Sequence, residues 1–260
     1  MANIDKHPAG SFCWIELATT DQNEAKKFYT SLFGWSVNDN PMGPGEFYSI
    51  FQLKGRDAAA GYTLRKDQRD RGVPVHWSLY ISVEDADQAV AKAKQAGGSI
   101  LMSAFDVMDV GRMAVIHDPT GAVFCMWQAK KSQGIGVAGE DNALCWADLS
   151  TPDPARAQKF YSDVFGWRLD KSERDNSGYM HIKNGEQHIG GVLPVTHRSP
   201  QTPAHWLLYI QVVDVDATVA RAQRSGGKTL APPNTIEGVG TWAVLADPQG
   251  AAFAVFKSAR

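Results

Sequence analysis

The 260-residue sequence predicts an α+β protein built from four βαβββ modules, two in each half of the chain. The prediction depends first on an internal repeat: KFYTSLFGW, which starts at Lys27, returns as KFYSDVFGW, which starts at Lys159. A second pair of segments, GRMAVIHDPTGAVF from Gly111 and GTWAVLADPQGAAF from Gly240, carries the repeat to the end of each half. Any site built on the shared scaffold therefore has a counterpart in the other half.

We expect one domain over residues 8–128, a linker over 129–142 and a second domain over 143–258. The linker contains GIGVAG, whose spaced glycines match a dinucleotide-binding pattern. That pattern needs a strand before it and a helix after it, so that the helix N-terminus can hold the pyrophosphate. A strand starting near Leu144 is expected to follow instead, so we interpret the segment as a flexible connector.

Within each half, hydrophobic periodicity and turn residues predict strand, helix and then two or three strands, twice over. The first helix begins at a capping box formed by Asp21 and Glu24 and ends at Gly34, and its counterpart begins at Asp153 and ends at Gly166. The remaining elements of the first half are expected at Phe12–Ala18, Trp35–Val37, Phe47–Leu53, Ala58–Leu64, His76–Val83, Asp85–Ala96 (a helix), Ser99–Leu101, Arg112–His117 and Ala122–Trp127.

Composition excludes several classes of partner. Lys and Arg number 26 against 28 Asp and Glu, for a net charge of −2, so no basic surface is expected to attract nucleic acid. No apolar run approaches the roughly 20 residues of a membrane span, so we expect no membrane partner and a cytoplasmic location. The three cysteines, Cys13, Cys125 and Cys145, are too few and too scattered for a disulfide framework. A monomer and a homodimer both remain open.

The repeated motifs resemble the vicinal oxygen chelate superfamily, which includes glyoxalase I, bleomycin-resistance proteins and extradiol dioxygenases. The resemblance is carried by FYxxxFGW in each first helix, by VEDAD (Val83–Asp87) and VVDVD (Val212–Asp216) at the second helices, and by DPTG and DPQG before each last strand. It covers almost the whole chain. It implies that the modules pair into two glyoxalase-like, cup-shaped domains with curved mixed sheets, and leaves open which modules pair.

The resemblance also implies where metal ligands would stand, and none of the expected histidines and glutamates is present. The usual ligand positions are occupied by Trp14, Ser78 and Cys125 in the first half and by Trp146, Leu207 and Ala254 in the second. A divalent ion in such a site needs about three nitrogen or carboxylate ligands. We therefore expect no metal site and no other cofactor.

Each half places one carboxylate and one histidine two residues from these positions, hence on the same strand face. The pairs are Glu16 with His76 and Asp148 with His205. Three interpretations remain open: a structural, hydrogen-bonded carboxylate; a buried catalytic base with a raised pKa; or a sparse metal site completed by water. A further pair, His181 and His188, is expected to lie across a hairpin as solvated side chains.

Aromatic side chains accompany both carboxylate–histidine pairs and favour the binding of a flat small molecule. The candidate ligand-binding residues are Trp14, His76, Ser78, Tyr80, Cys125, Trp127, Trp146, His205, Leu207, Tyr209 and Phe256, and the candidate catalytic residues are Glu16 and Asp148.

The leading hypothesis is a metal-free, glyoxalase-like protein that binds a small organic molecule in an aromatic cavity, for sequestration or detoxification. The alternative is a lyase, isomerase or dioxygenase of the same superfamily acting on a small aldehyde or hydroxy-ketone, with Glu16 or Asp148 as base or with a sparse metal site. A third hypothesis is an interaction protein whose cavities are filled by Trp14 and Trp146.

Overall fold

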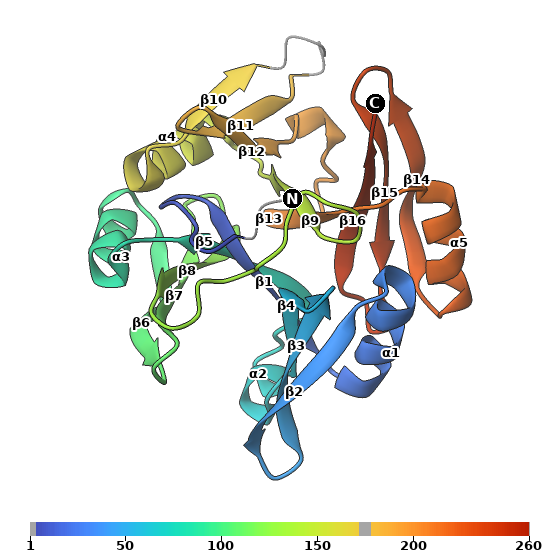
Figure 1. The fold of residues 1–260 in the computed structure, drawn as a ribbon. Helices are drawn as coiled ribbons and strands as arrows, with labels where there is room; N and C mark the ends of the chain where they lie inside the picture. The colour runs from blue at the N-terminus through green and yellow to red at the C-terminus, as the bar shows by residue number, and fades with distance from the viewer. Residues whose placement is uncertain (1–3, 172–177, 260) are drawn as a thin grey trace.

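A computed structural model describes residues 4–171 and 178–259, which form two eight-stranded mixed sheets, one from each half of the chain (Figure 1). The strand order is β2-β3-β4-β1-β5-β8-β7-β6 in the first sheet and β10-β11-β12-β9-β13-β16-β15-β14 in the second. The outer strands of each sheet do not pair with one another, so neither sheet closes into a barrel. The predicted fold is confirmed.

The elements of the first half are β1 (Phe12–Thr19), α1 (Gln22–Phe33), β2 (Ser36–Gly43), β3 (Glu46–Leu53), β4 (Arg56–Thr63), α2 (Lys66–Asp70), β5 (His76–Ser82), α3 (Ala86–Gln95), β6 (Ser99–Val107), β7 (Gly111–His117) and β8 (Val123–Ala129). Strands β2 and β6 are longer than the sequence predicted, and α2 was not predicted. Both strands are sheet edges and carry mostly exposed residues, so the apolar alternation that marks a half-buried strand is weak in them.

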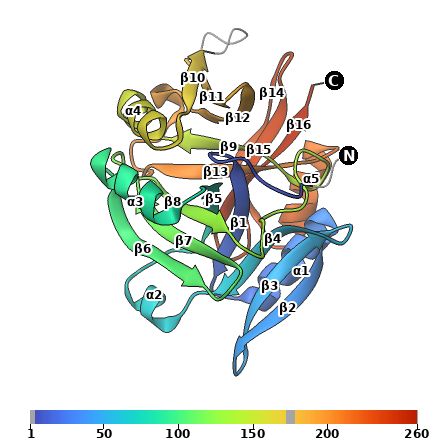
Figure 2. The same ribbon diagram turned by 60° about the vertical axis from the view of Figure 1, so that its left-hand side comes forward.

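The elements of the second half are β9 (Leu144–Ser150), α4 (Pro154–Phe165), β10 (Arg168–Lys171), β11 (Met180–Asn184), β12 (Gln187–Val192), the short 3₁₀ helix η1 (Val195–His197), β13 (His205–Gln211), α5 (Val215–Arg224), β14 (Lys228–Ile236), β15 (Gly240–Ala246) and β16 (Ala252–Ser258). In both views the β2–β3 hairpin and the β10–β11 pair project at opposite ends of the molecule (Figures 1 and 2).

The two modules of each half are joined at the centre of their sheet. Strand β1 pairs antiparallel with β5, and β9 pairs antiparallel with β13 in the same way. The flanking pairs, β1 with β4 and β5 with β8, are parallel. Module one therefore shares a sheet with module two, which answers the pairing question that the sequence left open.

The helices pair across the halves instead. Helix α1 contacts α5, and α3 contacts α4 (Figure 1). Asp21 accepts from the Glu24 amide as predicted, and Gly34 ends α1 in the left-handed conformation with a φ of 68°. The reciprocal half of the predicted capping box is not formed, because the Asp21 amide donates to Thr19 Oγ1 at 3.3 Å and the Glu24 carboxylate accepts from Lys27. The buried face of α1 includes Phe28, Tyr29 and Phe33, which pack in the core between the two sheets.

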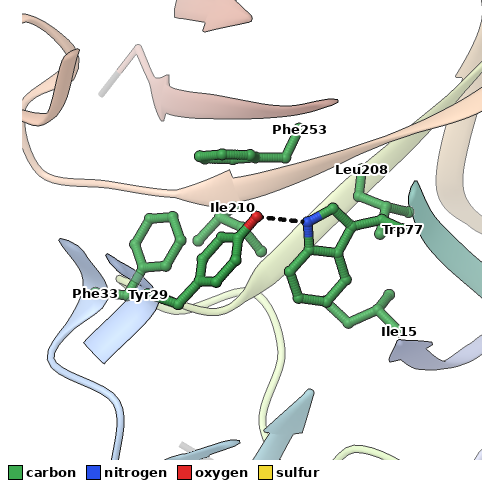
Figure 3. A pocket seen from close by; sticks show the side chains of 7 residues that line it. All are labelled: Ile15, Tyr29, Phe33, Trp77, Leu208, Ile210 and Phe253. Atoms are coloured by element: carbon green, nitrogen blue, oxygen red, sulfur yellow. Dashed lines mark hydrogen bonds between the residues drawn. The ribbon is translucent and has the colours of Figure 1, made fainter. Parts of the chain in front are cut away.

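Two equivalent hydrogen-bond relays cross the contact between the halves. In the first, Trp77 Nε1 donates to Tyr29 Oη at 3.0 Å, and Tyr29 Oη donates to Asp247 Oδ2 at 3.1 Å. In the second, Trp206 donates to Tyr161, which donates to Asp118 at 2.9 Å. A 10 Å³ space lies beside the first relay, enclosed by apolar side chains that include Phe253 (Figure 3).

The connector between the halves is packed against the first sheet, so its interpretation as a flexible segment was wrong. Ile135 and Val137 are each 1% exposed, and the Ile135 amide donates to the Cys13 carbonyl at 2.7 Å. Glu140 is buried and paired with Arg56. Apolar residues between the glycines anchor this segment.

None of the helices that the structure describes is long and apolar enough to cross a membrane.

Candidate functional site

Each sheet has one face toward the helices and one face away from them. Alternation along β1 puts Ile15 among the side chains between the halves and puts Trp14 and Glu16 on the opposite face. We call the face away from the helices the first cup in the sheet of β1–β8 and the second cup in the sheet of β9–β16.

At the centre of the first cup, Glu16 is held by two tyrosines. Its Oε1 accepts a 2.9 Å hydrogen bond from Tyr80 Oη, and its Oε2 accepts a 2.7 Å hydrogen bond from Tyr48 Oη. Trp14 Nε1 donates to the same Tyr48 hydroxyl at 3.0 Å. Burial raises the pKa of Glu16, and the two tyrosine hydrogen bonds oppose that rise. Both oxygens of this carboxylate therefore have partners within the protein.

The second cup repeats this centre with a shorter acid. Asp148 is 4% exposed, and its Oδ1 accepts from Tyr179 Oη at 2.7 Å and from Trp146 Nε1 at 3.0 Å. Burial raises the pKa of Asp148, and hydrogen bonding to Tyr179, Tyr209 and Trp146 lowers it in part. The pKa of Tyr209 lies well above its usual value because it is buried and faces Asp148, so the phenol stays neutral and donates.

The shorter acid is matched by a glycine on the neighbouring strand. Gly191 of β12 lies opposite Asp148, and a Cβ at this position would collide with Tyr179 Oη. In the first cup, Ala60 lies opposite Glu16 at the corresponding place. Aspartate is one methylene shorter than glutamate, so Tyr179 must lie closer to the strand to reach it, and glycine leaves the room.

The structure puts most of the predicted ligand-binding residues on the two cup faces. Ser78 lies opposite Glu16, and Tyr80 lies opposite Trp14 on β1 and Cys125 on β8. In the second cup the corresponding residues are Trp146, Leu207, Tyr209, Ala254 and Phe256, most of which form an apolar cluster separate from the main core.

The predicted carboxylate–histidine pairs are not formed. His76 Nδ1 bonds the Pro74 carbonyl at 2.8 Å, and His205 Nδ1 bonds the Pro203 carbonyl at 2.9 Å. Each histidine begins its strand, so its ring reaches back to the preceding turn, and Glu16 and Asp148 bond tyrosines instead.

The sequence did not identify Tyr48 or Tyr179 as residues of the cups, and it did not assign His181 to a site. The two tyrosines occupy equivalent places in the repeat, with a separation of 179 − 48 = 131 residues that is close to the offset between the two halves. The matching offset could have indicated that both tyrosines belong to the repeated site. Only the strand order, however, shows that β3 and β11 lie near β1 and β9.

His181 stands beside the centre of the second cup. Its ring lies edge-on to Trp146 at 6.0 Å and to Tyr179 at 5.2 Å between ring centroids, and 4.9 Å from the ring of His188. Burial, and then the charge of His188, lower the pKa of His181. The prediction that these two histidines share a hairpin is correct, but His181 is half-buried rather than fully solvated.

The two cups differ in how much aromatic surface they expose. Trp14 and Trp127 are 8% and 9% exposed, and Trp127 Nε1 donates to the Ser132 carbonyl of the connector. Their counterparts Trp146 and Phe256 are both partly exposed. The second cup therefore exposes more aromatic surface, although its acid, Asp148, is buried and Glu16 of the first cup is half-buried.

The residues present do not fit the metal ion of metal-dependent relatives. The ligand positions hold indole, hydroxyl, thiol and aliphatic groups, and burial raises the pKa of the Cys125 thiol. Within residues 4–171 and 178–259, no group of three or more His, Cys, Asp and Glu side chains is arranged to hold an ion.

An open cleft of about 540 Å³ lies outside both cups, at the end of the β14–β15 hairpin. Its lining includes Val213, Glu237 and Lys257 but neither Glu16 nor Asp148. The carboxylates of the cups are covered by their own tyrosine and tryptophan partners rather than exposed in a large preformed hole.

Known proteins resemble this chain over its full length. The "Putative glyoxylase CFP32" of Mycobacterium bovis is 41% identical over 261 residues, covering 100% of this chain and 99% of that protein. The "Anthracycline biosynthesis protein DnrV" of Streptomyces peucetius is 33% identical and covers 95% of this chain and 92% of its own length.

Among solved structures, the Mn(II)-bound glyoxalase from Novosphingobium aromaticivorans superposes with a TM-score of 0.66 at 14% identity, covering 96% of this chain and 82% of that one. The 2,3-dioxygenase LapB from Pseudomonas sp. KL28 gives the same TM-score and identity, covering 97% and 94%. These likenesses show the fold. The family model described as Glyoxalase/Bleomycin resistance protein/Dioxygenase superfamily matches residues 11–126 and again residues 143–255. With two matches that together span most of the sequence, the chain belongs to the Glyoxalase/Bleomycin resistance protein/Dioxygenase superfamily.

Proposed function

We propose that the protein binds a small, flat organic molecule in its second cup, through shape and hydrogen bonding and without the ion used by metal-dependent relatives. The observation that carries the proposal is the buried carboxylate of Asp148 beneath partly exposed aromatic side chains. Asp148 already accepts hydrogen bonds from Tyr179 and Trp146, so a ligand would reach the carboxylate by taking the place of one of these donors. A ligand that donates a hydrogen bond to Asp148 would be oriented while it stacks on Trp146 or Phe256.

In this proposal the first cup has a structural role and does not bind the ligand. Both carboxylates are bonded by aromatic side chains, and the cups differ in their exposed aromatic surface, because Trp14 is almost completely covered whereas Trp146 is partly exposed. The name of the anthracycline biosynthesis relatives is consistent with an aromatic ligand for this chain too.

Isothermal titration calorimetry with 2-naphthol, a flat molecule with one hydroxyl group, tests the proposal. We expect saturable binding to the wild-type protein with one site per chain. Asp148→Asn keeps the shape of the side chain but removes its charge, and should weaken binding about tenfold or more, because hydrogen bonds to charged groups contribute about 1.5–3 kcal/mol. Glu16→Gln is the matched control and should leave the affinity unchanged. Absence of binding to the wild type, or weakening by Glu16→Gln alone, would refute the proposal.

A second candidate function is favoured by the environment of the same carboxylate. Burial raises the pKa of Asp148, which suits a general base, and the neutral phenols of Tyr179 and Tyr209 could donate to an oxygen that gains negative charge. Such a site would act as an isomerase or lyase on a hydroxy-ketone. Exchange of the carbon-bound protons of dihydroxyacetone for deuterium, followed by NMR, tests it. Exchange that disappears in Asp148→Asn supports this function, and exchange no faster than in buffer contradicts it.

A further inference from the structure

The imidazole of His181 is available to a ligand. Within the part of the chain that the structure describes, neither His181 nor His188 has a side-chain hydrogen-bond or ion-pair partner. The rings of His7, His76 and His205, in contrast, each bond a backbone carbonyl. A half-buried polar ring without a partner gains from a ligand that supplies one.

His181 shares a row with Asp148 across three neighbouring strands. His181 of β11 lies opposite Gly191 of β12, which lies opposite Asp148 of β9. Strands lie about 4.8 Å apart, so two spacings separate the two backbones by roughly 10 Å. The position between them is a glycine, and the Tyr179 hydroxyl occupies the space above it on this row. A fused-ring molecule that reaches a polar group at each end of the row must therefore lie over Tyr179.

The first cup lacks this second polar group. Its equivalent row runs from Ile50 of β3 through Ala60 of β4 to Glu16 of β1. An isoleucine thus stands where the second cup has His181. The two cups share the carboxylate, the tyrosines and the tryptophan, and differ at this edge of the site.

We propose that His181 is a second polar anchor of the second cup, so that the cup selects flat organic molecules with hydrogen-bonding groups at two opposite edges, one for Asp148 and one for His181. The inference rests on the proposed function, whose site it extends. Since burial and His188 keep the pKa of His181 low, the ring is neutral near pH 7, and a neutral imidazole can both donate and accept. A hydroxyl, a carbonyl or an amide at the second edge would each satisfy it.

The test compares 2-naphthol with 2,6-dihydroxynaphthalene, which differs only by a hydroxyl at the far edge. We expect the wild-type protein to bind the diol about threefold to tenfold more tightly in calorimetry, the range for one added neutral hydrogen bond. His181→Phe keeps a flat ring against Trp146 and Tyr179 but removes both nitrogens. It should bind 2-naphthol like the wild type and lose the preference for the diol.

Two further variants complete the experiment. His181→Gln retains a donor and an acceptor and should restore part of the preference. His205→Phe changes another histidine of the same cup face, whose ring already bonds Pro203, and should keep the full preference. The inference is overturned if His181→Phe still prefers the diol, or if the wild type binds both compounds equally. If 2-naphthol itself does not bind, the proposed function fails and the inference fails with it. If 2-naphthol binds but the diol is not preferred, the inference alone fails, so the two failures are distinguishable.

Discussion

Tyr29 Oη, in the first half of the chain, donates a 3.1 Å hydrogen bond to Asp247 Oδ2 in the second. The other oxygen of Asp247 accepts from the backbone amides of its own turn, including those of Gly250 and Ala251. One carboxylate therefore closes a turn and joins the two halves. The equivalent contact from Tyr161 to Asp118 shows that the repeated FY and DP motifs form the interface rather than the cups.

Removing this contact should destabilise the protein without changing the cups. Tyr29→Phe leaves one oxygen of a buried carboxylate and the Trp77 indole without their partner. We expect the free energy of unfolding to fall by about 1–3 kcal/mol in urea denaturation, and Tyr161→Phe to have a similar effect. Tyr62→Phe is the control: Tyr62 is partly exposed, and among the described residues its hydroxyl is bonded by Gln68 alone, so stability should change by less than about 1 kcal/mol. Equal effects of all three variants would contradict this prediction.

The glycine beside Asp148 should not tolerate a side chain. In Gly191→Ala the new methyl group must displace Tyr179, which holds Asp148, so we expect a loss of about 1–3 kcal/mol in stability from overpacking. Thermal unfolding measures this, and the fluorescence of Trp146 reports the local change. Gly43→Ala is the matched control, because the nearest atom to its new Cβ would be 3.6 Å away and belongs to the flexible Glu46 side chain. A neutral Gly191→Ala would show that Tyr179 does not need its close approach to the strand.

The half-buried Glu16 and the buried Asp148 should make stability fall as the pH rises. Burial raises the pKa of Glu16 above its ordinary 4.5 and that of Asp148 above its ordinary 3.8. The native state therefore keeps protons that the unfolded chain has released. This contribution to stability is fully present below the ordinary pKa values and is lost as the pH rises through the native ones.

The double variant Glu16→Gln, Asp148→Asn cannot titrate at these positions. Its free energy of unfolding, measured in urea from pH 4 to pH 8, should increase relative to wild type as the pH rises. Asp67→Asn provides a control of opposite sign, because hydrogen bonding to Arg65 lowers the pKa of Asp67. A relative stability of the double variant that declines with pH would show that these carboxylates are stabilised in their charged form.

The stability of the protein should depend on the buried ion pair that holds the connector. Glu140 has a side chain 6% exposed and pairs with Arg56, with Lys54 Nζ 3.6 Å away. Arg56→Met leaves this carboxylate largely uncompensated and should cost about 3 kcal/mol in unfolding free energy. Adding Glu140→Leu should recover most of the loss, and Lys66→Met, in an exposed pair with Asp70, should cost less than about 1 kcal/mol. Failure of the second change to rescue the first would argue against charge burial as the cause.

The sequence was most informative where a pattern repeats within one strand or helix. The offset between the two copies of KFYxxxFGW predicted the modular fold, and alternation predicted that Trp14 and Glu16 share a strand face. The same alternation put His76 on that face but could not show that its ring turns back to Pro74.

Partners that come from distant strands could not be predicted in the same way. Tyr48 reaches Glu16 from 32 residues away because β3, β4 and β1 are neighbours in the sheet, and local periodicity does not reveal that order. The role of His181 depends equally on the β11–β12–β9 arrangement. The burial of Ile135 was missed because glycines on both sides made the connector resemble a flexible loop.

Because each tyrosine–aspartate contact joins one half of the chain to the other, neither half is expected to be stable alone. Tyr29 needs a turn that only the second half supplies, and Tyr161 needs one that only the first half supplies. Fragments cut at the connector would each expose an apolar helix layer and a carboxylate oxygen that has lost its tyrosine partner, so neither is expected to remain monodisperse alone. Mixed together, they should reassociate as a noncovalent heterodimer, with the covalent link serving mainly to raise the effective concentration of one half near the other.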